Sequence, residues 1–236
     1  MEEAGSLVID VRVKNTHKVL HLLLQSDGLS RVDISRMTGL TKTTISSIVR
    51  ELVSFGLVEE RPAIPTGNVG KNPVPLYVRP DAVYTVGVYL GRRELSVVLL
   101  DAKMDILLEG MEIPYEGSEP ENVIPKLFIA IDDIMEEGEK RGFKVGAVGV
   151  GVPGPLDTEK GVVKHPPKFK GWNNVPLGKI IYERYGLPVW IENDANAGAL
   201  AERWCGDGKN IGTFIFLLGN EGLGAGIVVN GELYRG

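Results

Sequence analysis

Residues 42–55, KTTISSIVRELVSF, carry the apolar pattern that most restricts how this chain can fold. An apolar residue recurs at every third or fourth position, namely at Ile45, Ile48, Val49, Leu52 and Val53. This spacing places the apolar side chains on one face of a helix, while the other face is polar. Thr41 precedes the segment as an N-cap and Gly56 ends it. The segment therefore predicts an amphipathic helix with a buried stripe and an open polar face.

Two shorter signals before this segment complete a helix-turn-helix order. Residues 15–25 form an apolar helical run, which Asp27-Gly28 breaks. Ser30 then stands as the N-cap of a short helix over residues 31–38, with Asp33 near the capping-box position and Gly39 as the turn. The extended runs LVEERP and PLYVRP follow, joined by the loop AIPTGNVGKNPV. These runs predict a two-stranded wing.

The polar face of the longer helix is the candidate DNA-binding surface. In a helix-turn-helix the second helix enters the major groove, where hydroxyls and cations meet phosphates and base edges. The residues expected to contact DNA are Lys42, Thr43, Thr44, Ser46, Ser47 and Arg50, together with Lys71 and Asn72 near the tip of the wing. The alternative interpretation is a three-helix module that packs onto protein, with a merely solvated Ser/Thr-rich face.

Charge and cysteine content set the broad class. Residues 1–80 hold ten Lys/Arg and eight Asp/Glu, whereas residues 81–236 hold 16 and 23. A mildly basic head on an acidic body favours an anionic partner for the head. The single Cys205 excludes an internal disulfide framework, and no apolar run reaches the roughly 18 residues of a membrane span. The acidic N-terminus lacks signal-peptide features. We therefore expect a cytoplasmic protein with no membrane partner.

The segment from residue 81 onward predicts an α/β fold with a mixed sheet. Two extended runs around residues 90–93 indicate a hairpin, and residues 104–116 continue it as a third strand. Strands and helices then alternate. Helices are expected over 121–141, 177–185 and 194–204, and strands over 145–152, 188–193, 213–218 and 225–229.

Asn193 and Asp194 are the first candidate site residues, because they end a strand and open a helix. A carboxylate at the carboxyl end of a strand faces a cleft and can accept hydrogen bonds from vicinal hydroxyls. The alternative is that one of these residues only caps the helix. Gly154, in a Pro-Gly-Pro turn, would let backbone approach a ligand closely, or it simply ends a strand. Trp172 is expected to pack in the core or between lobes rather than to stack on a ligand.

Several motifs in order resemble the ROK family of repressors, open reading frames and sugar kinases. They are the winged helix, GVGVPGPLD, the GVV…GW loop, ENDANAGALAE and GLGAGIVVNGELYRG. The resemblance implies an actin-like, ribonuclease-H-like domain with sugar bound between two lobes. It implies sugar contacts at Gly154, Asn193, Asp194 and His165, with Asp194 as general base in a kinase. A lone histidine such as His165 is more often structural or exposed.

The phosphate side departs from the kinase pattern. Kinases of this family carry an Asp and a Gly-Gly-Thr turn in the first hairpin, where this chain has Tyr89 and the turn Gly91-Arg92-Arg93. Their second phosphate loop reads Gly-Thr-Gly, where this chain has Asn220-Glu221-Gly222. A bulky turn without a metal-facing carboxylate, opposite an acidic loop, is a poor cradle for magnesium and polyphosphate. The alternative is that Arg92 and Arg93 bind phosphate in another geometry.

The resemblance divides the chain into a winged helix-turn-helix domain over 1–80, a first lobe over 81–205 and an incomplete second lobe over 206–236. Family members continue with a cysteine-rich zinc motif, so zinc is expected only from a downstream segment and no metal site within this chain. The preferred function is a homodimeric, sugar-responsive repressor of carbohydrate genes that binds a double-stranded operator without a cofactor. An ATP- and magnesium-dependent hexose or amino-sugar kinase is the alternative. A third interpretation is a ligand-independent DNA-binding protein with a vestigial sugar domain.

Overall fold

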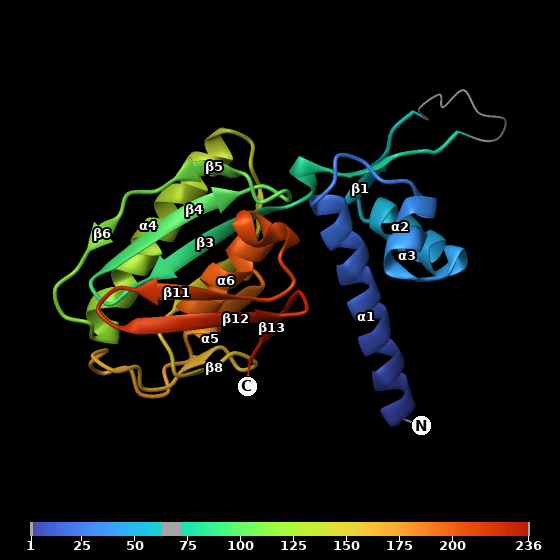
Figure 1. Cartoon of the computed structure of the whole chain (residues 1–236). Helices are drawn as coiled ribbons and strands as arrows, with labels where there is room; N and C mark the ends of the chain where they lie inside the picture. The colour runs from blue at the N-terminus through green and yellow to red at the C-terminus, as the bar shows by residue number, and fades with distance from the viewer. Residues whose placement is uncertain (1, 63–71, 236) are drawn as a thin grey trace. The chain divides into compact units, whose positions relative to one another are not determined.

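The computed structural model describes residues 2–62 and 72–235, with side chains from residue 11 onward in those ranges. The chain divides into two compact units, Met1–Ala82 and Val83–Gly236. The elements of the first unit are helices α1 (Glu2–Leu24), α2 (Arg31–Thr38) and α3 (Lys42–Ser54), strands β1 (Val58–Glu60) and β2 (Leu76–Val78), and the short 3₁₀ helix Pro80–Ala82 (Figure 1). Strands β1 and β2 pair antiparallel, so the helix-turn-helix order with a wing is present.

The caps predicted for the helix-turn-helix are confirmed. The Ser30 hydroxyl accepts the backbone N–H of Asp33, and Asp33 accepts the backbone N–H of Ser30 at 3.2 Å, which is a complete capping box. Gly39 adopts the left-handed conformation at φ 72°, and the Thr41 side chain caps α3 at Thr44. These local bonds fix where each helix begins and ends.

Two details of this unit differ from the prediction. Helix α1 begins at Glu2 rather than at residue 15, and Arg12 on its added turns pairs with Glu51 of α3. No proline interrupts residues 2–24, and the ion pair supports the longer helix. Val53, expected in the buried stripe, is 38% exposed, whereas Ile45, Ile48, Val49 and Leu52 are buried. Val53 lies at the edge of the apolar face.

The second unit is built on a mixed sheet with strand order β10-β7-β3-β4-β5. The predicted hairpin is β3 (Tyr84–Leu90) with β4 (Glu94–Leu100), and β7 (Val145–Val152) and β10 (Val189–Asn193) join it in parallel. The predicted third strand is divided into β5 (Ile106–Glu109) and β6 (Ile113–Pro114). Gly110 lies between them, and its N–H bonds Val97 O at 2.9 Å.

Helices cover both faces of this sheet. Helices α4 (Pro120–Lys140) and α5 (Leu177–Tyr185) pack on one face, where alternate valines and leucines of the strands form the main core (Figure 1). Helix α6 (Asp194–Trp204) packs on the other face, where Gly151 lies against Ala197. Valine and glycine alternate along much of β7, so one face of the strand packs in the main core and the other lets α6 approach closely.

Helix α6 also packs on a second, three-stranded antiparallel sheet. This sheet consists of β11 (Phe214–Gly219), β12 (Leu223–Val229) and β13 (Glu232–Tyr234). A Cβ at Gly226 would lie 2.3 Å from the carbonyl oxygen of Ala195 and 2.6 Å from Ala199 Cβ, so helix and strand approach closely only because Gly226 has no side chain. The outward side chains Ile215, Leu217 and Leu223 of this sheet are exposed.

The loop between β7 and α5 carries the short hairpin β8 (Leu156–Asp157) and β9 (Val162–Val163). Trp172 in this loop is 1% exposed, as expected for a core residue, and its indole N–H donates to Ser118 O. Among the residues that the structure describes, no helix combines the length and apolar character needed to cross a membrane.

Candidate functional site

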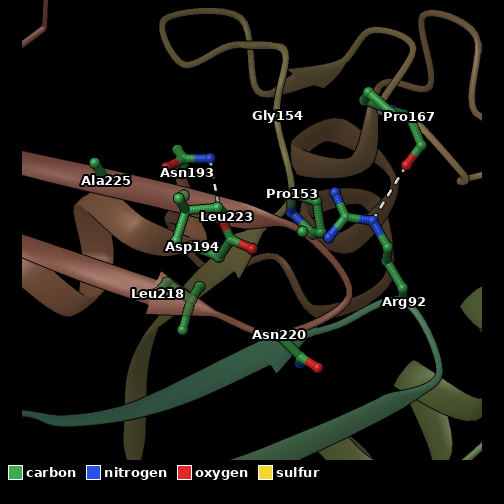
Figure 2. Close-up of a pocket in the computed structure, with 12 residues that line it drawn as sticks. Arg92, Pro153, Gly154, Pro167, Asn193, Asp194, Leu218, Asn220, Leu223 and Ala225 are labelled. Carbon is green, nitrogen blue, oxygen red and sulfur yellow. Dashed lines mark hydrogen bonds between the residues drawn. The ribbon is translucent and has the colours of Figure 1, made fainter.

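A pocket of about 360 Å³ opens at the carboxyl ends of β7 and β10, facing the turn between β11 and β12 (Figure 2). Parallel strands present their carboxyl ends at the same edge of a sheet, which is where open α/β sheets bind ligands. Its volume lies at the small end of the range for ligand pockets. The lining residues are Arg92, Pro153, Gly154, Pro167, Asn193, Asp194, Leu218, Asn220, Gly222, Leu223, Gly224 and Ala225.

Asn193 and Asp194 form the polar end of this pocket. The Asn193 Oδ1 accepts the backbone N–H groups of Ala195 and Asn196 at 3.1 and 3.2 Å, so Asn193 is the N-cap of α6. Its Nδ2 donates to Asp194 Oδ1 at 2.9 Å, which also accepts the N–H of Ala195. Within the described ranges, Asp194 Oδ2 has no hydrogen-bond partner. Helix capping and pocket lining thus coexist at this pair.

Gly154 lies beside that pair. A Cβ at Gly154 would lie 3.3 Å from Asn193 Nδ2, so the absence of a side chain lets this turn approach the polar end of the pocket. His165 is exposed in the loop after β9 and does not line the pocket. The structure therefore brings Gly154, Asn193 and Asp194 together and leaves His165 apart. The roles predicted for these residues in sugar binding stay predictions.

Arg92 is a pocket residue that the sequence reasoning did not assign to the ligand site. It enters from the turn between β3 and β4, and its Nε donates to Pro167 O at 3.1 Å (Figure 2). A Cβ at Gly222 would lie 3.6 Å from its Nη1, so the guanidinium rests against the β11–β12 turn. In the sequence, the only indication of this role was the presence of two adjacent arginines in a predicted hairpin turn.

The positions that depart from the kinase pattern contact one another. Arg93 forms an ion pair with Glu221 across the two turns. Asn220 Nδ2 donates to the Tyr89 hydroxyl at 3.3 Å, and Lys168 Nζ donates to Glu221 O at 3.2 Å. Contacts between side chains of the protein therefore occupy the space between the two turns, where the kinase pattern has its phosphate loops. This arrangement holds the β11–β12 turn against the β3–β4 turn.

Tyr115 fixes the turn that carries Arg92. Its backbone N–H donates to Arg93 O at 2.7 Å, and its hydroxyl donates to Gly91 O. Burial raises the pKa of Tyr115 well above its usual value, with smaller contributions from Tyr89 and Glu94. The hydroxyl therefore stays protonated and keeps donating to the turn.

The predicted DNA-contacting residues on α3 share one side of the helix. Lys42, Thr43, Ser47 and Arg50 are exposed, and Thr44 and Ser46 are half-buried. Beside them lies a groove of about 380 Å³, lined by Arg31, Ser46, Arg50, Val53 and Glu60. In the wing, Asn72 is half-buried, and Lys71 lies outside the described residues.

The described part of the chain contains no group of three or more His, Cys, Asp or Glu side chains placed to hold a metal ion. The pocket itself contributes a single carboxylate, Asp194. Its other side chains with hydrogen-bonding groups are amides and a guanidinium, which suit hydroxyl or anion recognition.

Comparisons with known proteins identify similar families and relatives. The model of the ROK family matches residues 85–236, and that of the MarR family matches residues 14–67. The xylose repressor of Caldicellulosiruptor bescii is 34% identical over 92% of this chain and 54% of its own length. The glucokinase of Thermotoga maritima is 35% identical over 64% of this chain and 46% of its own length. The chain spans about half the length of these curated relatives.

A solved structure matches residues of both units. It is a crystal structure of a ROK family transcriptional regulator, described as a homologue of the Escherichia coli Mlc protein. It has a TM-score of 0.77 and 27% identity, and the match covers 95% of this chain and 57% of that one. With the family model matching well over half of its residues, and a winged helix-turn-helix ahead of the sugar-kinase-like lobe, this chain belongs to the ROK family.

Proposed function

We propose that this protein is a sugar-responsive DNA-binding transcriptional regulator that represses genes of carbohydrate metabolism. The observation that carries the proposal is the pairing, in one chain, of an exposed polar recognition helix with a small pocket that ends in Asn193 and Asp194. Relatives named as sugar repressors support it over the length of both units. A panel of sugars, tested for their effect on DNA binding, would identify the class of this chain's own effector.

In this mechanism Asp194 and Asn193 bind vicinal hydroxyls of the sugar, and the backbone at Gly154 approaches the ring. Two recognition helices of a cytoplasmic homodimer read a palindromic operator with half-sites about one helical turn apart. Sugar binding shifts the population between DNA-binding and released states by the difference in its affinity for them. The proposed cycle uses no ATP or magnesium, and zinc is expected only from a downstream segment.

The kinase alternative has Asp194 in its favour, because a carboxylate at that position can accept a proton from a hydroxyl. The contacts on the phosphate side argue against it. Tyr89 provides no carboxylate for magnesium, and Glu221, which stands in the second phosphate loop by resemblance to family kinases, would repel polyphosphate. A regulator that binds sugar without phosphorylating it agrees better with these residues.

The experiment that tests the proposal is selection of DNA from a random library by the intact protein, repeated with a panel of neutral and derivatised sugars. We expect enrichment of one palindromic sequence, and one sugar that changes the yield. Enrichment that no sugar alters would support the ligand-independent interpretation. Absence of any enriched sequence would overturn the regulator proposal.

A further inference from the structure

We propose that the effector bound in this pocket carries an anionic substituent, a phosphate ester or a carboxylate, and that Arg92 is its charge partner. The inference rests on the proposed function, because it names the chemistry of the sugar that the pocket takes. Its starting point is that the pocket has opposite charges at its two ends, Asp194 from α6 and Arg92 from the β3–β4 turn (Figure 2).

The charge of Arg92 is not balanced within the described ranges. No Asp or Glu oxygen there lies within ion-pair distance of its guanidinium, and its Nε bonds the neutral carbonyl of Pro167. The adjacent residue Arg93 differs from Arg92, because the guanidinium of Arg93 is paired with Glu221. A half-buried cation without a carboxylate favours an anion in the space that it faces.

The surroundings of Arg92 do not cancel its positive charge. A second cavity of about 450 Å³ lies on its other side and includes Arg93, Lys168, Glu116 and Glu221. Glu221 is paired with Arg93, and Lys168 donates to the carbonyl of Glu221 rather than to its carboxylate. Glu116 is exposed and has no ion pair among the described residues. Across this cavity the cations Arg92, Arg93 and Lys168 face the carboxylates Glu116 and Glu221, so one positive charge is left over.

Hydrogen bonds fix the position of the Arg92 guanidinium and of the turn that carries it. Pro167 O fixes Nε, and Tyr115 bonds both Gly91 and Arg93 on either side of Arg92. The terminal nitrogens stay available beside the pocket, and a planar guanidinium can pair two of its N–H groups with two oxygens of a phosphate or carboxylate. A sugar whose hydroxyls bond Asn193 and Asp194 would place an anionic substituent at the opposite end of its ring, near Arg92.

The test compares matched sugars by isothermal titration calorimetry on the intact protein. Each aldose or N-acetylated amino sugar is supplied in its neutral form and as its phosphate monoester, and each aldose also as its uronate, with inorganic phosphate alone as a further titrant. The variants are Arg92→Gln and the charge-preserving Arg92→Lys. Lys170→Ala is the matched control, because Lys170 is an exposed cation of the neighbouring loop that lines neither cavity.

We expect at least one anionic sugar to bind tenfold or more tightly than its neutral counterpart, a difference of about 1.4 kcal/mol. Arg92→Gln should remove that difference, Arg92→Lys should keep part of it, and Lys170→Ala should leave it unchanged. The phosphate and uronate arms distinguish the two sources of the anion.

Three results would overturn the inference. The first is equal or tighter binding of the neutral sugar, which, if that sugar also changed DNA binding, would leave the proposed function standing. The second is an anionic preference that survives in Arg92→Gln. The third is inorganic phosphate binding as tightly as the ester. Absence of binding by every sugar would overturn the proposed function as well.

Discussion

The guanidinium of Arg93 and the carboxylate of Glu221 form an ion pair that joins the β3–β4 turn to the β11–β12 turn. Both residues stand at positions where family kinases carry Thr, so the two departures from the kinase pattern compensate each other in charge. The side chain of Arg93 is 80% exposed and that of Glu221 is 25% exposed. Such a pair contributes at most about 1 kcal/mol, so its main effect is on the position of the turns.

This pairing leads to a prediction about phosphoryl transfer. The protein should form no ADP above background with ATP, magnesium and any sugar, and the double variant Arg93→Thr/Glu221→Thr should be equally inactive. The reason is that Tyr89 still supplies no carboxylate for the metal. A coupled assay of ADP release, with an authentic sugar kinase as positive control, checks this. Sugar-dependent ADP formation by either protein would restore the kinase alternative.

Asp194→Ala should abolish the response to sugar and leave DNA binding intact. The substitution removes the carboxylate that lines the pocket but keeps Asn193 as the N-cap of α6. We expect at least a tenfold loss of sugar affinity, or about 1.4 kcal/mol, measured by calorimetry beside an operator titration. Asp133→Ala, which removes an exposed carboxylate of α4, is the control. Lost DNA binding in a folded Asp194→Ala protein would contradict the division of labour between the units.

Arg50→Ala should weaken operator binding. Arg50 is an exposed cation on the polar side of α3 and lines the groove beside it. A base contact would cost about 1–3 kcal/mol and relax specificity at one position, whereas a phosphate contact would reduce the salt slope of binding by about 1. Fluorescence anisotropy at several salt concentrations separates the two. Lys103→Ala, an exposed cation of the second unit, should bind as the parent does.

Ser30→Ala should destabilise the helix-turn-helix by about 1 kcal/mol, the usual cost of losing an N-cap. The hydrogen bond from Ser30 lowers the pKa of Asp33 below its usual value. The stability that Asp33 contributes is therefore present above its unfolded-state pKa and is lost as the pH falls through its lower folded-state pKa. Ser30→Ala removes the largest cause of that shift, so the variant should lose less additional stability on acidification than the parent. Thermal unfolding followed across the acidic range tests both effects, and identical pH dependence would contradict the assignment.

The features that local chemistry specifies could be predicted from the sequence. Ser30, Gly39 and Thr41 mark helix ends through bonds to residues a few positions away. The buried face of α3 follows from its spacing, apart from Val53 at the edge of that face. The start of α1 was missed, and the pairing of Arg12 with Glu51 of α3 is a long-range contact that local spacing does not indicate.

Long-range pairing accounts for what the sequence did not reveal about the site. Arg92 and Arg93 are neighbours in the chain, yet Arg92 lines the pocket while Arg93 pairs with Glu221. The two roles are assigned by where the fold places Pro167 and Glu221. Neither hydropathy nor spacing encodes those positions. Gly226 likewise falls within a strand that the sequence predicts, but nothing in the spacing indicates that it allows α6 to pack on β12.

The buried indole of Trp172 gives the protein an intrinsic optical reporter. Trp172 belongs to the same loop as Pro167, which holds Arg92, and it stacks near Phe169 with ring centroids 5.1 Å apart. Trp190 is exposed and Trp204 is half-buried, so the emission of the buried Trp172 should lie at a shorter wavelength than that of Trp190. A ligand that moves Arg92, or restricts its motion, would shift the short-wavelength emission of Trp172. No attached dye would be needed. Occupancy of the pocket could then be followed in real time, with Trp172→Phe as the silent reference.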